Sequence, residues 1–184
     1  MRTPNEIHHI AEMRALMHVG HSSSRPLSVD YELIGVVGEV AFQREFEVLG
    51  FMMDEENRPG GDKGIDFESH SGTIDVKTAR KPHFLFVEEG KAVTDIYVLA
   101  KYHEGLLDAT LIGWCYREEI AGQPVKCFGG HRIRNHYLPA DKLRPIVELK
   151  ELIVFDLPGP VESEILDRRK PTTYDSRTGE PSNG

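Results

Sequence analysis

Two aspartates and a lysine lie on two short segments whose pattern predicts a β-hairpin. Asp66 belongs to the first segment, and Asp75 and Lys77 belong to the second. Because side chains alternate along a strand, Asp75 and Lys77 point to one face of the hairpin. Two carboxylates can hold Mg²⁺, and a neighbouring ammonium can act on a water or a phosphate. These residue types predict hydrolysis of a phosphodiester.

A predicted helix before the hairpin, at about 29–49, contributes a further carboxylate. Its apolar stripe at helical spacing consists of Val36, Phe42, Phe46 and Leu49. Glu39 belongs to the same stripe and therefore faces inward. A buried carboxylate is unfavourable unless it is paired or bound to a metal. We therefore expect Glu39 to reach from the helix toward Asp66 and Asp75.

The elements that position these residues predict an α/β fold, with a central mixed sheet of about four or five strands flanked by helices. Two nearly continuous apolar runs, at 95–100 and 109–115, are typical of central strands covered on both faces. Further expected elements are an N-terminal helix at 5–17, a helical turn at 117–121, a loop or short helix at 138–143 and a last strand at 151–156. We expect a single domain over 1–157, with its core at about 29–156, and a flexible tail at 158–184.

The composition favours a protein of the reducing cytoplasm. The chain of 184 residues fits one domain, and its two cysteines have no disulfide-framework spacing. Neither a secretion signal nor an apolar run long enough to span a membrane is recognisable in the sequence. The net charge of -8 argues against a broadly basic nucleic-acid surface, although it is compatible with a local basic patch.

The order of these residues resembles the PD-(D/E)XK nuclease superfamily, which has the restriction-endonuclease-like fold. The matching elements are a helix with Glu39, a strand with Asp66 and a strand with Asp75-Val76-Lys77. The resemblance covers roughly residues 33–115. Two departures are Ile65, where the superfamily has proline, and Asp rather than Glu as the second acid. Neither changes the chemistry, because proline ligates nothing and both acids coordinate Mg²⁺ through oxygen.

The resemblance implies a Mg²⁺-dependent deoxyribonuclease, with Mn²⁺ as a substitute and a 5′-phosphate as product. Asp66, Asp75 and the Val76 backbone carbonyl would bind the metal, and Glu39 would complete a first or second shell. Lys77 would orient or help to deprotonate the attacking water, or stabilise charge in the transition state. A metal would lower the pKa of Lys77 and the carboxylates would raise it, so the sign stays open. The implied role is an endonuclease of recombination, repair, restriction or phage DNA processing, acting on duplex or branched DNA as a homodimer.

Several polar residues near this set are candidates for contacting nucleic acid: Gln43, Lys63, Thr78, Arg80, Lys81, Arg132 and Arg134. Gln43 lies one helical turn after Glu39. Arg132 and Arg134 belong to a basic run that fits a solvated loop equally well. The glycine-rich segment 60–64 lacks the spacing of a phosphate-binding loop, so we expect no nucleotide cofactor.

Other interpretations remain open at this point. Asp75 and Lys77 would form an ordinary ion pair if their face of the hairpin were solvated. A catalytically silent nucleic-acid-binding or assembly subunit would keep the fold without cutting, and an interaction protein unrelated to nucleic acid is a third class. A zinc site assembled from Cys115, Cys127, His131 and His136 lacks a recognised spacing. The sequence leaves open the DNA structure recognised, DNA or RNA, endonuclease or exonuclease, and one metal or two.

Overall fold

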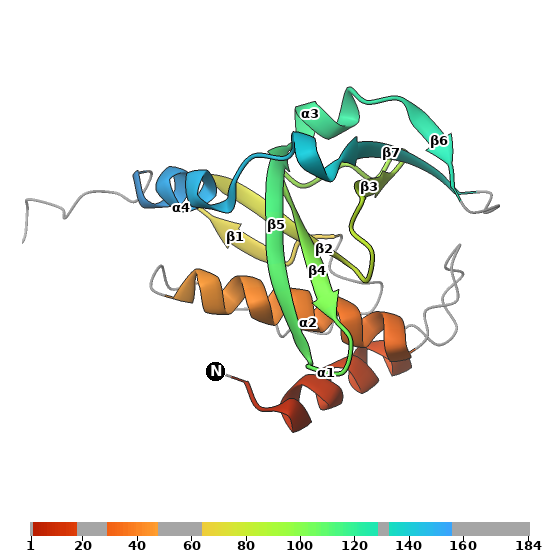
Figure 1. Ribbon diagram of the computed structural model, residues 1–184, viewed down its shortest axis with the longest axis vertical. Coiled ribbons are helices and arrows are strands. Elements are labelled where there is room, and N and C mark those ends of the chain that lie inside the picture. Colours follow the sequence, from red (N-terminus) through yellow and green to blue (C-terminus); the bar gives the residue numbers. More distant parts are fainter. Residues whose placement is uncertain (1, 18–28, 48–63, 129–132, 156–184) are drawn as a thin grey trace, which may run out of the picture.

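The computed structural model describes residues 2–17, 29–47, 64–128 and 133–155. They form an α/β structure with a four-stranded mixed sheet and a second sheet of three strands (Figure 1). The helices are α1 (Pro4–Met17), α2 (Val29–Glu45), α3 (Arg117–Ala121) and α4 (Ile146–Phe155), with a short 3₁₀ helix, η2 (Ala140–Lys142). None of the helices in these ranges is both long and apolar enough to cross a membrane.

The larger sheet has the strand order β1 (Phe67–Ser69), β2 (Gly72–Ala79), β4 (Ile96–His103) and β5 (Asp108–Tyr116). Strands β2 and β4 are parallel, whereas the other two pairs are antiparallel. The smaller sheet has the order β3 (Phe84–Glu88), β7 (Arg134–Pro139) and β6 (Val125–Cys127), and all its pairs are antiparallel. The predicted mixed sheet is therefore confirmed, and a second sheet accompanies it.

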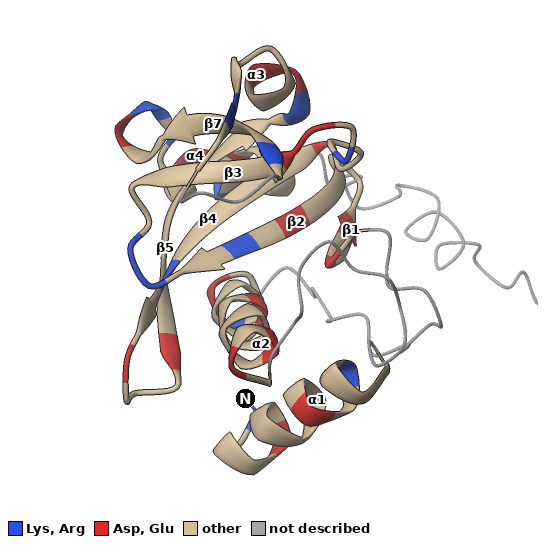
Figure 2. Cartoon of the chain, turned by 90° about the vertical axis from the view of Figure 1, so that its right-hand side faces the viewer, with Lys and Arg blue, Asp and Glu red and all other residues tan. Residues whose placement is uncertain are grey.

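Two hydrophobic cores lie on opposite faces of the larger sheet. One core contains Ile74 and Val76 of β2 together with Val36 and Phe42 of α2. The other core lies between the two sheets and contains Tyr97, Leu99, Leu85, Val87 and Leu138. In Figure 2, α2 lies on one side of β2 and β4, and β3 and β7 lie on the other. Since strand residues alternate between faces, consecutive residues of β2 enter different layers.

The expected central position is correct for the strand at 95–100 and wrong for the strand at 109–115. The second of these is β5, which is an edge strand of the larger sheet. Its outer edge is covered where Trp114 and Arg144 exchange two backbone hydrogen bonds, of 3.0 and 2.8 Å. Trp114 and Cys115 are buried in the two cores on opposite faces of the sheet, so an apolar run of this kind does not distinguish a covered edge strand from a central one.

The predicted last strand at 151–156 is wrong where it is described, because its first five residues belong to α4. Leu149 and Ile153, one helical turn apart, are buried in the core beside α2, whereas Val147 and Val154 are exposed. The segment at 138–143 contains the end of β7 and then η2. Strands β3, β6 and β7 were not expected as strands. The tail at 158–184 lies outside the described residues.

Candidate active site

Asp66 lies opposite Asp75 where the β1–β2 hairpin opens. The register that pairs Phe67 with Ile74 brings the preceding residue, Asp66, across from Asp75. The backbone N–H of Asp66 donates to the Ile74 carbonyl at 2.9 Å, and Asp66 Oδ2 accepts from the Val76 N–H at 2.7 Å. Because the N–H and C=O of one strand residue point to the same edge, the Val76 carbonyl also points toward Asp66.

Asp75 and Lys77 form a close ion pair on the face of β2 that points toward the smaller sheet. Lys77 Nζ lies 2.6 Å from Asp75 Oδ2, and Asp75 is only 4% exposed. Asp75 is in register with Tyr97, whose side chain lies in the core between the sheets. Burial lowers the pKa of Lys77, but the charge and hydrogen bond of Asp75 outweigh it and raise that pKa above its usual value. In this environment Lys77 is a charged hydrogen-bond donor.

Glu39 lies on α2, which packs on the opposite face of the larger sheet from Asp75, and its charge acts on Asp66. Its predicted inward position is confirmed, because it is 5% exposed among core residues of α2. Both carboxylate oxygens accept hydrogen bonds from Arg14 of α1, at 2.5 and 2.8 Å. This two-pronged pair supplies the compensation that a buried carboxylate needs. The sequence interpretation missed Arg14.

A signal for Arg14 exists in the sequence of α1. Ile7 and Ala11 are buried, and Arg14 lies on the same helical face at the next spacing. An arginine in line with an apolar stripe is the same kind of anomaly that identified Glu39. Two such anomalies of opposite charge on neighbouring helices predict a buried ion pair.

A glycine on α2, next to Glu39, lets the helix approach β2 closely. A Cβ atom on Gly38 would lie 1.8 Å from Thr78 Oγ1, closer than any real contact. Thr78 was predicted to contact nucleic acid, but its hydroxyl points toward α2. Within the described residues, Thr78 Oγ1 is buried and has no hydrogen-bond partner. Gly38 thus allows the part of α2 that carries Glu39 to lie close to β2.

The carboxylates of the site influence one another electrostatically. Burial, then the charge of Glu39 and then that of Asp75 raise the pKa of Asp66 well above its usual value. The Val76 N–H and Lys77 act in the opposite direction but do not cancel the rise. Acidic and basic positions of β2 lie between α2 and the smaller sheet in Figure 2. The cluster therefore has an excess of negative charge that a bound cation would relieve.

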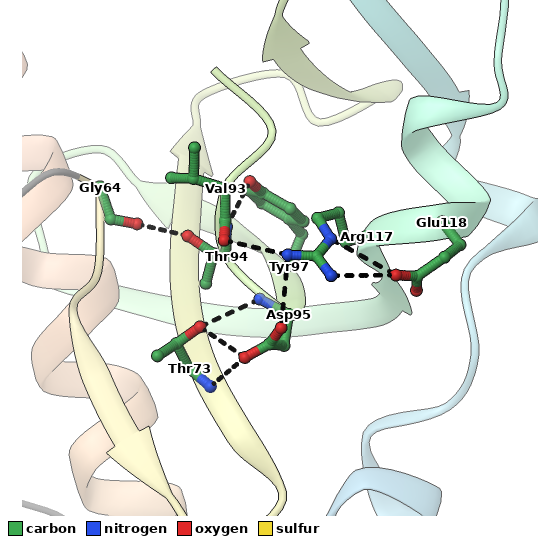
Figure 3. A network of polar contacts seen from close by, with 8 residues as sticks. All are labelled: Gly64, Thr73, Val93, Thr94, Asp95, Tyr97, Arg117 and Glu118. Atoms are coloured by element: carbon green, nitrogen blue, oxygen red, sulfur yellow. Dashed lines mark hydrogen bonds and ion pairs between the residues drawn. The ribbon is translucent and has the colours of Figure 1, made fainter. Parts of the chain in front are cut away.

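A polar network holds the backbone just before Asp66 against the start of β2 and β4 (Figure 3). Thr94 Oγ1 donates to the Gly64 carbonyl at 2.7 Å, and the Thr94 N–H donates to Tyr97 Oη at 3.2 Å. The Asp95 carboxylate accepts from the Thr73 N–H at 2.9 Å and the Thr73 hydroxyl at 2.8 Å. Gly64 also lies close to Asp75, since a Cβ atom added to this glycine would be 3.8 Å from Asp75 Oδ2. These contacts fix the approach of Asp66 to Asp75.

The donor set fits a magnesium ion held by few protein ligands. In the described part of the chain, no three His, Cys, Asp or Glu side chains form a group that could hold a metal. Mg²⁺ commonly keeps several waters and binds through one or two carboxylates. Asp66, Asp75 and the Val76 carbonyl are hard oxygen donors of the kind that Mg²⁺ requires. Glu39 is engaged with Arg14, so a direct metal contact by Glu39 stays a prediction.

The remaining predicted contact residues are not gathered into one surface. Gln43 is half-buried one turn after Glu39, and Lys81 is exposed after β2. Arg80 pairs with Glu104 at 3.1 Å and lies over the Tyr102 ring. Arg134 is exposed on β7, where it pairs with Glu89 at 3.2 Å. Lys63 and Arg132 lie outside the described residues.

The described residues of the zinc site considered above do not come together in the structure. Cys115 is buried in the core between the sheets, which raises the pKa of its thiol to about 12. Cys127 is exposed on β6. His136 Nδ1 lies 2.9 Å from the Gln123 carbonyl, and His131 lies outside the described residues. Cys115, Cys127 and His136 therefore do not form a shared metal site.

Comparison with protein-family models, with curated proteins and with solved structures found no match to this chain. We therefore base the functional argument on the chemistry of the site.

Proposed function

We propose that this chain is a Mg²⁺-dependent deoxyribonuclease with a restriction-endonuclease-like core. The observation that carries the proposal is the convergence of Asp66, Asp75 and Lys77 at one edge of a sheet, with Glu39 close enough to raise the pKa of Asp66. The neighbouring carboxylates oppose the ionisation of Asp66, and a bound cation would favour it, so this arrangement supports a cation-binding role.

Each residue of the cluster has a role that its contacts support. Asp66, Asp75 and the Val76 carbonyl would hold Mg²⁺, or Mn²⁺ in its place. The ion would supply Lewis-acid stabilisation of negative charge on the phosphate. Arg14 holds the Glu39 carboxylate in place through its two hydrogen bonds. Glu39 then contributes negative potential to the site without having to be a direct ligand.

Lys77 would donate a hydrogen bond to the scissile phosphate as negative charge develops on it. The ammonium is held in place by Asp75 at 2.6 Å, and its raised pKa makes it a poor proton acceptor at neutral pH. We therefore favour charge stabilisation over deprotonation of water as its role. Water attacks phosphorus and loses a proton to solvent, the bond to the 3′ oxygen breaks, and that oxygen takes up a proton, so the products carry a 3′-hydroxyl and a 5′-phosphate.

A second candidate function is a nucleic-acid-binding or assembly subunit that does not cut. It is favoured by the two ion pairs, Arg14 with Glu39 and Lys77 with Asp75, which neutralise two of the three carboxylates without any metal. This candidate predicts binding that is independent of divalent ions. It also predicts no cleavage of any substrate with Mg²⁺ or Mn²⁺.

The deciding experiment uses a panel of end-labelled DNAs: single strand, duplex, flap and four-way junction, each with Mg²⁺, Mn²⁺ or EDTA. Asp75→Asn and Lys77→Met should each reduce cleavage by at least about 10²-fold to 10³-fold, as expected for loss of a charged group that stabilises the transition state. Lys101→Met, on the neighbouring strand β4, removes an exposed lysine and serves as the matched control. Full activity in Asp75→Asn or Lys77→Met would disprove the catalytic assignment, and no cleavage by the wild type would favour the binding subunit.

A further inference from the structure

An aromatic cluster covers the smaller sheet on the side away from the larger one. Its members are Phe84 and Phe86 of β3, Tyr137 of β7 and Phe128, which follows β6. Phe86 and Tyr137 are directly paired in the register of β3 and β7. Contacting rings have centroids 4.6 to 6.1 Å apart, in tilted or edge-to-face arrangements. We call these four residues the aromatic face.

Alternation along the strands shows that this face belongs to neither core. Leu85, Val87 and Leu138 point inward and are buried against the larger sheet. The rings at the positions between them are only half-buried. In Figure 1 the strands of the smaller sheet lie in the upper part of the view, whereas α1 and α2 lie in the lower part. The aromatic face is therefore a surface feature that the packing of the two sheets does not require.

A lysine gives this face a positive charge. Lys126 Nζ lies 5.7 Å from the centroid of the Phe128 ring, and the residue is exposed. Within the described residues, no carboxylate forms an ion pair with Lys126. Glu88, which is in register with Lys126 across β7, is paired with Lys91 at 3.0 Å. In a chain with a net charge of -8, this local cation beside aromatic rings fits an anionic, planar ligand.

The size of the aromatic face fits a small footprint better than a second copy of the chain. An aromatic side chain has on the order of 200 Å² of surface, so four rings that are each at most about a third exposed offer no more than roughly 300 Å². A stable protein interface needs about 800 Å² from each partner. Two or three stacked bases require much less area, and they bind through ring faces with a cation nearby.

We propose that the aromatic face binds single-stranded DNA, with bases stacked on the partly exposed rings and Lys126 against a phosphate. This inference rests on the proposed nuclease function and deepens it, because it names the substrate class. The DNA that is cut would carry a single-stranded part, such as a flap, an end or an unpaired arm. The smaller sheet would hold that part while the duplex lies at the site on β2.

The test is fluorescence anisotropy with a labelled 12-nucleotide oligo-dT and a duplex of equal length, in low salt with EDTA so that no cutting occurs. Phe86→Leu and Tyr137→Leu keep apolar side chains but remove the stacking ring. Each should weaken oligo-dT binding about tenfold, as expected for one stacked base. Tyr137→Phe keeps the ring and should bind like the wild type. Tyr31→Leu, an exposed aromatic at the start of α2, is the control at a remote surface.

Thermal melts followed by circular dichroism identify variants that have lost their fold. In folded variants, a loss of oligo-dT affinity for both leucine changes and none for Tyr31→Leu supports the aromatic face. Unchanged affinity in both leucine variants overturns it, as does a wild type that does not bind oligo-dT. A dimer that dissociates in Phe86→Leu without DNA would also overturn it, in favour of self-association.

Failure of this inference can be distinguished from failure of the nuclease proposal. Ring-dependent oligo-dT binding without any cleavage would leave the aromatic face standing and disprove the nuclease. If cleavage needs Asp75 and Lys77 but does not change in Phe86→Leu, the nuclease proposal stands and the aromatic face is disproved as a substrate-binding surface. Because the binding measurement contains EDTA, it does not depend on the metal or on catalysis.

Discussion

Two aspartates beside the same strand, Asp95 and Asp66, have pKa values shifted in opposite directions. Asp95 accepts hydrogen bonds from the backbone and then the hydroxyl of Thr73, which lower its pKa, and its side chain is about half exposed. Burial, Glu39 and Asp75 raise the pKa of Asp66. Thr73 and Asp95 connect β2 to β4 and favour the ionised acid. The fold disfavours the ionised form of Asp66. We therefore propose that this aspartate serves to bind a cation and does not stabilise the fold.

The largest effect should come from breaking the buried pair that compensates the Asp66 cluster. Arg14→Met leaves Glu39 buried and unpaired, which should reduce the free energy of unfolding by about 3–5 kcal/mol. The measurement is urea unfolding of the metal-free protein at pH 7. Removing the second charge as well, in Arg14→Met with Glu39→Gln, should recover most of the loss. A loss below about 1 kcal/mol in the single variant would show that water reaches Glu39 and that the pair acts like a surface pair.

This pair also shows where sequence reasoning ended. The inward position of Glu39 was predictable because one carboxylate interrupted an apolar stripe, and the hairpin was predictable from alternation and its turn. Arg14 was missed because α1 was interpreted from its apolar residues alone, although Arg14 continues the line of Ile7 and Ala11. Pairing between helices that are separated by residues 18–28 depends on tertiary packing, which a local pattern does not contain.

The smaller sheet was missed for a different reason. Strand β3 follows a proline and begins with Phe84, and its alternation was hidden because aromatic residues occupy the outward positions. A pattern with Phe outside and Leu or Val inside is apolar on both faces, so period two disappears. The same residues form the aromatic face. Strand prediction therefore failed at the same surface for which we propose a ligand. Such a coincidence is expected where residues are selected for function and not for the regular pattern of a strand.

The next prediction separates the two aspartate environments by metal binding. Asp75→Asn should weaken Mn²⁺ binding by about 10-fold to 100-fold, since it removes one of few charged donors. Asp95→Asn should leave the Mn²⁺ affinity within about twofold, because Asp95 is held by Thr73 and Arg117 at the end of the strands. Isothermal titration calorimetry on the metal-free protein measures both. Equal losses in the two variants would contradict the assignment of the ion to the Asp66 side.

A smaller effect is expected from the contact that brings α2 to β2. Gly38→Ala places a methyl group against Thr78 Oγ1, where nothing can fit without movement. We expect a loss of about 1–2 kcal/mol in unfolding free energy, as for an overpacked core position. Thr78→Gly in the same chain should restore most of it by making room. Gly35→Ala, where a Cβ meets nothing within 4 Å, is the matched control on the same helix.

The smallest effect is a gain in stability, and it comes from the residue that we assign to the metal. Burial and the neighbouring carboxylates raise the pKa of folded Asp66 above its unfolded value, so the folded state binds the proton more tightly. Stability therefore falls as pH rises from the unfolded pKa through the folded one. Asp66→Asn, which is neutral at every pH, should melt above the wild type at pH 7 and together with it near pH 3.

Added Mg²⁺ should reverse this order, because it binds the folded wild type and stabilises it by mass action. Wild type should gain melting temperature with increasing Mg²⁺, whereas Asp66→Asn should gain little. Differential scanning calorimetry in EDTA and in Mg²⁺ gives both comparisons on the same samples. If the wild type were more stable than Asp66→Asn in EDTA at pH 7, ionised Asp66 would stabilise the fold, as Asp95 does. That result would contradict the proposal that the cluster binds a cation.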